Sequence, residues 1–168
     1  MSPRIARWLE VVRLKHVDRA GWIRAGISHP ESVAAHSWGV AWLVLELLPP
    51  DLDLGRALAY AVLHDLPEAR VGDITPHDGV DAADKHAQEA RAAAALLPRA
   101  LADRWRAYEA QADPEARFVR QLDRLDMVLQ AVAYRERAND VRPFLVSARR
   151  VVVEPELVAL LDALEQSV

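Results

Sequence analysis

The chain contains no cysteine. This absence excludes disulfide frameworks, thiolate nucleophiles and zinc sites built on thiolate ligands. Six histidines are present, and histidine is the side chain best suited to metal ligation and to acid–base chemistry near neutral pH. Any metal bound by this protein must therefore be held by nitrogen and oxygen ligands.

The chain also lacks a strong excess of charge of either sign. It carries 21 Lys and Arg residues against 25 Asp and Glu, a formal net charge of −4 over 168 residues. Such a chain has no basic excess to neutralise the phosphates of a polymeric nucleic acid, whereas a small anionic ligand remains compatible with it. A hydrophobic share of 52% and a charged share of 27% exclude intrinsic disorder. The length predicts a single domain over residues 1–168.

Long hydrophobic runs are missing as well. The longest apolar stretch, Val40 to Leu48, is interrupted by Glu46 and ended by Pro49, so it is too short to span a bilayer. The first residues, Met1 to Glu10, contain no continuous apolar segment of the kind found in a signal peptide. We therefore expect a soluble, cytoplasmic protein with no membrane partner.

Two of the residues that favour β-strands, isoleucine and threonine, are scarce. Four isoleucines and one threonine stand beside thirty alanines, which predicts an all-α fold. Prolines and glycines separate the segments of helical periodicity and predict about eight helices, with loops over Gly21–Pro30 and Val71–Gly79. The expected helices are Pro3–His16, a helix from Ser32 that ends before Pro49-Pro50, Gly55–Leu66, Asp84–Leu97, Pro98–Ala112, Pro114–Asn139, Pro143–Val153 and Pro155–Glu165.

The dipeptide His64-Asp65 is the sharpest chemical feature. It stands at the end of an apolar helix, where adjacent side chains project about 100° apart and can meet one cation only if neighbouring helices supply further ligands. His36 and Asp123 are the best donors, because each is a polar residue in an otherwise apolar helical segment. Glu68 and Asp73 follow closely, and burying several carboxylates together is costly unless a cation neutralises them. The residues therefore predict a metal site.

Several ordered motifs around these residues resemble the HD-domain metal-dependent phosphohydrolases, in particular their 5'-deoxynucleotidase branch. The resemblance covers most of the chain. The matching pieces are Gly21-Trp22, Pro30 to Val33 before His36, His64 to Ala69 with Val71 to Ile74, Lys85-His86 with Glu89, and Glu115 to Asp123.

The resemblance implies a ligand set and a catalytic group. The principal divalent metal would be held by His36, His64, Asp65 and Asp123. Glu68 would serve as the acid/base for the attacking water or the leaving oxygen, which makes Asp65 and Glu68 the expected catalytic residues. Glu68, Asp73 and the Ile74 carbonyl would touch additional ions. The donor set suits Mn²⁺, Co²⁺, Fe²⁺ or Mg²⁺ about as well as Zn²⁺.

The resemblance also implies which residues would contact the substrate. Trp22 resembles the family residue that packs beside the deoxyribose and disfavours a 2'-hydroxyl. Where relatives carry an Arg-Asn pair, this chain has Ala25-Gly26, and the acid before the first ligand histidine is Ala35. We expect Arg24, Asp73 and His77 to contact the substrate, with Arg19 as a second candidate for the phosphate.

Other residues are expected to support the fold or the ligands. Asp126 lies one turn after Asp123 and is expected to act behind the metal ligands. His86 is expected on a helix surface. Four tryptophans at helical spacing are expected in the core or in an interface, namely Trp8, Trp38, Trp42 and Trp105.

The leading hypothesis is a metal-dependent 5'-deoxynucleotidase of nucleotide metabolism that releases phosphate from deoxyribonucleoside 5'-monophosphates, and the resemblance suggests a homodimer. Three alternatives stay open. The first is an HD phosphatase for another small phosphomonoester, because Ala25-Gly26 alters the substrate wall. The second is a non-catalytic HD module that binds a nucleotide. The third is an HD-type di-iron oxygenase, for which His77 and His86 are the spare histidines.

Overall fold

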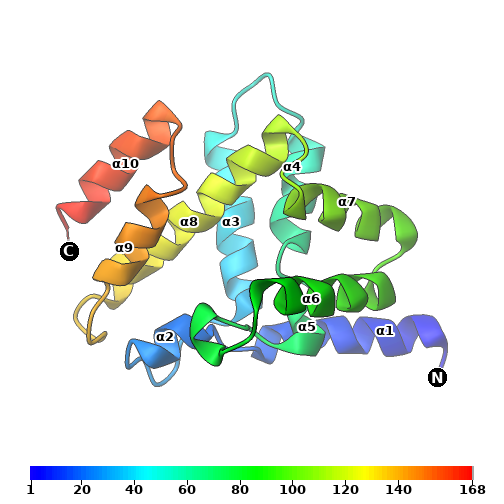
Figure 1. Cartoon of the computed structure of the whole chain (residues 1–168). Coiled ribbons are helices and arrows are strands. Elements are labelled where there is room, and N and C mark those ends of the chain that lie inside the picture. The colour runs from blue at the N-terminus through cyan, green and yellow to red at the C-terminus, as the bar shows by residue number, and fades with distance from the viewer. Residues whose placement is uncertain (168) are drawn as a thin grey trace.

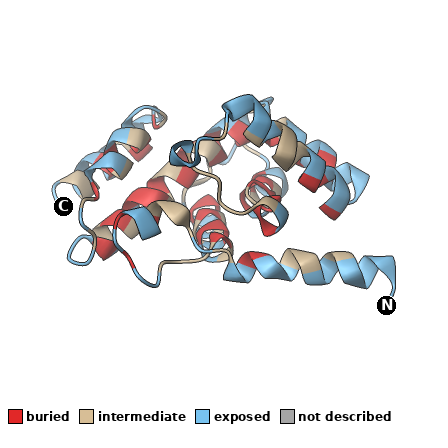
Figure 2. Cartoon of the chain, turned by 60° about the horizontal axis from the view of Figure 1, so that its bottom comes forward, coloured by how far each residue is buried: buried red, intermediate tan, exposed pale blue. Residues whose placement is uncertain are grey.

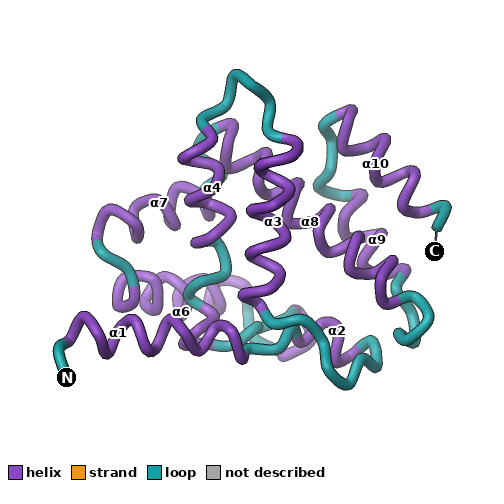
Figure 3. The backbone as a smooth tube through the Cα atoms, turned by 180° about the vertical axis from the view of Figure 1, so that it is seen from behind, coloured by secondary structure: helices purple, strands orange, loops and turns teal. Residues whose placement is uncertain are grey.

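The computed structural model describes residues 1–167 and is all-α, as the composition predicts (Figures 1 and 3). Over this range the only strand-like pairing is an isolated bridge between Asp18 and Ser32. Eight of the α-helices have eight or more residues, in agreement with the predicted number. The elements are α1 Pro3–Val12, the 3₁₀ turn η1 Arg13–His16, α2 Ala20–Arg24, α3 Val33–Leu47, α4 Leu54–Leu63, α5 Glu68–Val71, the 3₁₀ turn η2 Pro76–Asp78, α6 Ala82–Leu96, α7 Arg99–Glu109, α8 Pro114–Tyr134, α9 Arg142–Arg149 and α10 Pro155–Glu165.

Short polar side chains and prolines set the helix starts. Ser32 accepts the Ala35 N–H at 3.2 Å and begins α3, while Asp113 accepts the Ala116 N–H at 2.8 Å and begins α8. Such caps satisfy backbone donors that the first helical turn leaves free. Proline stands in the first turn of α1, α8, α9 and α10, where its missing N–H costs nothing.

Helices α3, α4 and α8 cross near the middle of the molecule (Figure 1). Their apolar side chains, including Val40, Val44, Val119 and Leu122, are fully buried in the main core. A second core cluster lies around Trp105 and joins α5, α6 and α7 to the start of α3. The helix surfaces turned away from these cores are exposed (Figure 2). The central crossing holds the parts of the chain that carry the predicted metal ligands.

Several element boundaries differ from the sequence prediction, among them the end of the first helix at Val12, where the turn η1 follows. The expected loop over Gly21–Pro30 contains most of the short helix α2. Helix α4 ends at Leu63 rather than Leu66, because Pro67 has no N–H to donate to the Leu63 carbonyl and its ring crowds that turn. Helix α8 ends at Tyr134, since the Asn139 N–H donates to the Ala25 carbonyl at 2.7 Å instead of continuing the helix. Helix α9 likewise ends early, at Arg149.

The tryptophans divide into two groups. Trp105 is 1% exposed and belongs to the second core cluster, which confirms its expected place. Trp8, Trp38 and Trp42 are 52%, 70% and 49% exposed, so they are not core residues of this chain. Among residues 1–167 no helix combines the length and the apolarity needed to cross a membrane.

Candidate metal centre and adjoining cavity

The structure brings the four predicted metal ligands together. His36 comes from α3 and Asp123 from α8, while His64 and Asp65 directly follow the end of α4. His36 Nε2 lies 3.1 Å from Asp123 Oδ1, 3.4 Å from His64 Nε2 and 3.8 Å from Asp65 Oδ2. His64 Nε2 lies 3.2 Å from the same Asp65 oxygen. We call these four residues the ligand cluster.

Hydrogen bonds on the outer side of each imidazole fix how the rings face the cluster. His36 Nδ1 lies 2.7 Å from Asp126 Oδ2, and His64 Nδ1 lies 2.9 Å from the Ala61 carbonyl. Both partners accept, so each Nδ1 carries the hydrogen and each Nε2 is left to face the cluster. Support of this kind holds metal-ligating histidines in one tautomer and one orientation.

The cluster attracts positive charge. Burial and the nearby Arg19 act to lower the pKa of His36, but hydrogen bonds to Asp123 and Asp126 outweigh them and raise it to about 9. Burial acts to raise the pKa of Asp65, but the neighbouring His64 and Arg19 hold it well below its usual range. Ligand atoms of His36, His64 and Asp65 lie within 4.8 Å of one another, and Asp123 Oδ1 lies 3.1 Å from His36 Nε2. Imidazole nitrogens and carboxylate oxygens suit a divalent metal of the first transition row or Mg²⁺. The donor set therefore fits the metal that the sequence predicts.

Glu68, the predicted acid/base, lies at the start of α5 and is 4% exposed. Its Oε2 is buried and has no hydrogen-bond partner among the described residues. Burial, reinforced by repulsion from Asp65 and Asp73, raises the pKa of Glu68 to about 10. An unpartnered buried carboxyl group beside the ligand cluster is costly in a merely structural role, so this oxygen fits a group that binds water or a cation.

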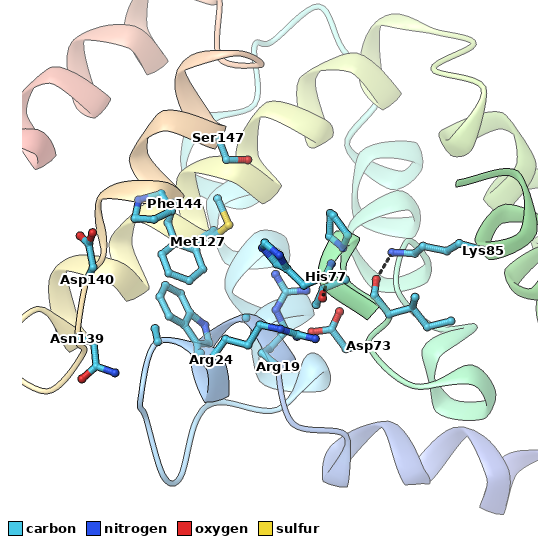
Figure 4. A pocket seen from close by; sticks show the side chains of 17 residues that line it. Arg19, Arg24, Asp73, His77, Lys85, Met127, Asn139, Asp140, Phe144 and Ser147 are labelled. Carbon is cyan, nitrogen blue, oxygen red and sulfur yellow. Dashed lines mark hydrogen bonds between the residues drawn. The ribbon is translucent and has the colours of Figure 1, made fainter. Parts of the chain in front are cut away.

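Two of the three groups predicted to hold additional ions, Asp73 and the Ile74 carbonyl, already have partners. Asp73 Oδ2 accepts the Ala20 N–H at 2.8 Å, and the Ile74 carbonyl accepts Lys85 Nζ at 2.7 Å (Figure 4). Lys85 in turn lies 3.5 Å from Glu89. In this structure the Lys85 ammonium therefore supplies the positive charge next to Ile74.

A cavity of about 480 Å³ adjoins the cluster, within the usual size of a small-molecule site. Arg19 connects the two, because it lines the cavity and its Nη1 lies 3.4 Å from Asp65 Oδ2. All four residues expected to contact the substrate line this cavity, namely Trp22, Arg24, Asp73 and His77. Arg24 is paired with Asp78, and Trp22 is only 1% exposed.

The sequence missed part of this site. Met127, Phe144 and Ser147 form much of the wall that faces Asp73 and His77 (Figure 4), and nothing in their spacing distinguishes them from core or surface residues. Glu31 was also missed. One of its carboxylate oxygens lies within 4.8 Å of a His36 nitrogen and an Asp126 oxygen.

The spare histidines do not join the cluster. His86 stacks on Trp105 with ring centroids 5.9 Å apart and lies 3.6 Å from Glu109. His77 is exposed on the cavity wall. Over residues 1–167 the histidines that share a possible metal group are His36 and His64, which gives no support to a di-iron centre.

Known proteins resemble this chain in sequence and in fold. A family model described as an HD domain matches residues 11–154. The chain is 34% identical over 165 residues to the 5'-deoxynucleotidase HDDC2 of Homo sapiens, which covers 92% of this chain and 81% of that protein. It is 36% identical over 138 residues to the 5'-deoxynucleotidase hdd1 of Schizosaccharomyces pombe, covering 76% of this chain and 70% of that protein.

Solved structures also resemble this chain in fold. A protein of Pyrococcus horikoshii OT3 superposes with a TM-score of 0.83 at 33% identity, covering 98% of this chain and 99% of that chain. A structure from Magnetospirillum magnetotacticum, described as a predicted metal-dependent phosphohydrolase, gives a TM-score of 0.73 at 27% identity, covering 98% of this chain and 91% of that chain. From the matched family model, these relatives and the shared helical architecture, we conclude that the chain belongs to the HD domain family.

Proposed function

We propose that this protein is a metal-dependent 5'-deoxynucleotidase, which hydrolyses deoxyribonucleoside 5'-monophosphates to the deoxynucleoside and phosphate. The observation that carries the proposal is the ligand cluster of two histidines and two aspartates beside a cavity of about 480 Å³. Relatives at 34–36% identity bear the name 5'-deoxynucleotidase, which supports the same reaction here.

The ligand cluster would hold the principal metal through His36, His64, Asp65 and Asp123. When bound, such an ion supplies Lewis-acid polarisation of a phosphoryl oxygen and lowers the pKa of water. Mn²⁺, Co²⁺, Fe²⁺ and Mg²⁺ are the candidates, because the nitrogen and oxygen donors do not favour one of them strongly. Glu68, Asp73 and the Ile74 carbonyl are the candidates for further ions.

Two residues of the chain act on the phosphate group. Arg19 binds it, because its guanidinium lies between the ligand cluster and the cavity and pairs well with phosphate oxygens. Glu68 moves the proton between the attacking water and the leaving oxygen, because its buried Oε2 has no other partner among the described residues and a positioned carboxyl group is a common acid–base catalyst. Asp65 contributes by holding the metal.

The sugar and base would extend from the ligand cluster into the cavity. Trp22 belongs to the wall on which the deoxyribose would lie, and Arg24, Asp73 and His77 line the same space. Ala25-Gly26 stands where the family pattern has an Arg-Asn pair, and the Asn139 N–H donates to the Ala25 carbonyl there. For that reason another small phosphomonoester is the second candidate substrate.

Three further properties stay predictions. They are a homodimer, a cytoplasmic location and a single HD domain over residues 1–168. Light scattering checks the first, and the expected molar mass is twice the 18.7 kDa of one chain. A molar mass equal to one chain across the micromolar range would contradict it.

A substrate panel tests the proposed function. Purified protein is assayed for phosphate release from 5'-deoxyribonucleotides, 5'-ribonucleotides and simple sugar phosphates, each with Mn²⁺, Co²⁺ and Mg²⁺. We expect metal-dependent release that favours the deoxyribonucleotides. Preference for a sugar phosphate would support the second candidate, and nucleotide binding without release would support the non-catalytic module.

A further inference from the structure

Trp22 lines the cavity but exposes very little of its surface there. It is 1% exposed, because the phenyl ring of Phe144 from α9 covers its indole with ring centroids 3.9 Å apart and planes 28° apart. Gly21 makes room for this ring, since a Cβ there would lie 3.3 Å from Phe144 Cε1. Phe144 is half-buried and lines the cavity. The Phe144 ring therefore faces the cavity, and the Trp22 indole lies behind the Phe144 ring.

The indole is fixed from behind. Trp22 Nε1–H donates to Glu31 Oε1 at 2.9 Å, and the ring of Tyr134 meets the indole edge-on at 5.3 Å and 85°. The Glu31 N–H donates to Tyr134 Oη at 2.9 Å. These contacts fix the plane and the position of the Trp22 ring. The Trp22 ring in turn supports the ring of Phe144.

Glu31 also reaches toward the ligand cluster. Its carbonyl accepts the Arg19 N–H at 3.1 Å, and its carboxylate lies within 4.8 Å of His36 and Asp126. Arg19 is the residue that joins the cluster to the cavity. Glu31 thus contacts the aromatic wall through its side chain and the segment that presents the guanidinium through its backbone carbonyl.

The two walls of the cavity differ in chemistry. Phe144 and Met127 lie on one side, while Asp73 and His77 lie on the other, with Arg19 between them (Figure 4). A nucleotide whose phosphate pairs with Arg19 would place its sugar and base against the aromatic side, since sugar and base faces bind well on aromatic rings. An added 2'-hydroxyl pressed against this apolar wall would lose hydrogen bonds to water.

We propose that Phe144 is the substrate-contacting residue of the sugar wall, and that Trp22 and Glu31 are positioning residues that hold it there. The inference rests on the proposed deoxynucleotidase function and extends it, because it names the stack that sets the choice between deoxyribose and ribose. Selectivity would then depend on a residue of α9 and on Glu31, and not on the indole alone.

The first experiment replaces Phe144. Phe144→Ala and Phe144→Leu are compared with Val146→Ala, a control on an exposed position of the same helix. Binding of 2'-deoxyadenosine and adenosine is measured by calorimetry without added metal, and kcat/KM is measured for dAMP and AMP with Mn²⁺. We expect Phe144→Ala to weaken deoxyadenosine binding about three- to tenfold and to lower the dAMP to AMP ratio by a similar factor. Val146→Ala should leave both unchanged.

The second experiment tests the positioning residues. Glu31→Ala should lower the dAMP to AMP ratio through KM rather than kcat, while Glu31→Gln, which keeps an oxygen for the indole N–H, should restore it. In a Trp22→Phe background the indole N–H is gone, so the two Glu31 variants should have equal ratios. Melting curves of every variant identify any that fail to fold.

The outcomes separate the two claims. A dAMP to AMP ratio and a deoxyadenosine affinity that stay within twofold of wild type in both Phe144 variants would overturn the inference, while the proposed function would stand. Wild-type protein that binds deoxyadenosine through Phe144 but hydrolyses no nucleotide would overturn the proposed function alone. Wild-type protein that neither binds nor hydrolyses would overturn both.

Discussion

Asp126 touches His36 on the side turned away from the ligand cluster, and Gly39 makes this contact possible. A Cβ at position 39 would lie 2.1 Å from Asp126 Oδ1 and 2.8 Å from its Cγ, so an alanine there must displace the carboxylate. Displaced supporting carboxylates typically cost 10–100-fold in metal affinity. Position 39 therefore requires glycine.

We predict that Gly39→Ala weakens Mn²⁺ binding by roughly ten- to a hundredfold, measured by calorimetry. Gly55→Ala, at the exposed start of α4, is the matched control and should bind Mn²⁺ like wild type. Unchanged Mn²⁺ affinity in Gly39→Ala would show that Asp126 does not orient His36.

Glu68 is expected to act on protons and not to hold the principal metal. We predict that Glu68→Gln, which keeps the size of the side chain, lowers kcat about 10²- to 10⁴-fold while the protein still binds one principal metal ion. Bound metal is measured by elemental analysis and kcat by phosphate release. A Glu68→Gln variant with wild-type kcat would remove Glu68 from the mechanism.

At the scale of helices, the start of α8 is bonded to α4, and these two helices position three residues of the ligand cluster. Asp113 caps α8, accepts Tyr60 Oη from α4 at 2.6 Å and pairs with Arg56 at 3.3 Å. Burial acts to raise the pKa of Asp113, but these hydrogen bonds outweigh it and lower the pKa. Because the folded pKa is depressed, this stabilisation is present above the unfolded value near 3.9 and is lost as the pH falls through the folded value.

We predict that Asp113→Ala lowers the free energy of unfolding by about 1–2 kcal/mol at pH 7. The difference from wild type should shrink as the pH falls below about 4. Asp113→Asn, which keeps the cap but not the charge, should fall between the two. Urea unfolding at several pH values measures the free energy of unfolding of each variant. A difference between wild type and Asp113→Ala that does not depend on pH would contradict a stabilising role for the ionised Asp113 carboxylate.

The helix starts were predictable because their signals are local. Ser32 and Pro114 act on backbone groups within one turn, so the sequence carries the whole cause. The end of α8 was not predictable, because Asn139 bonds to Ala25, a residue more than a hundred positions away. Boundaries set by tertiary contacts leave no local pattern to detect.

At the scale of the whole molecule, the crossing of α3, α4 and α8 assembles the candidate site. The ligand cluster was predictable, since His64-Asp65 ends an apolar helix and the remaining ligands are polar residues in apolar segments. Phe144 and Glu31 were not, because their importance arises only where α9 packs over α2. The roles of all these residues in catalysis stay predictions until they are tested.

One measurement tests the central claim most directly: bound Mn²⁺ and phosphate release from dAMP, determined on the same samples of wild-type protein and His64→Ala. His64 is buried and its Nε2 faces His36 and Asp65. We predict that wild type binds Mn²⁺ and releases phosphate, and that His64→Ala loses both together while keeping its helical content. Phosphate release by His64→Ala at the wild-type rate, or none by Mn²⁺-loaded wild type, would contradict the account.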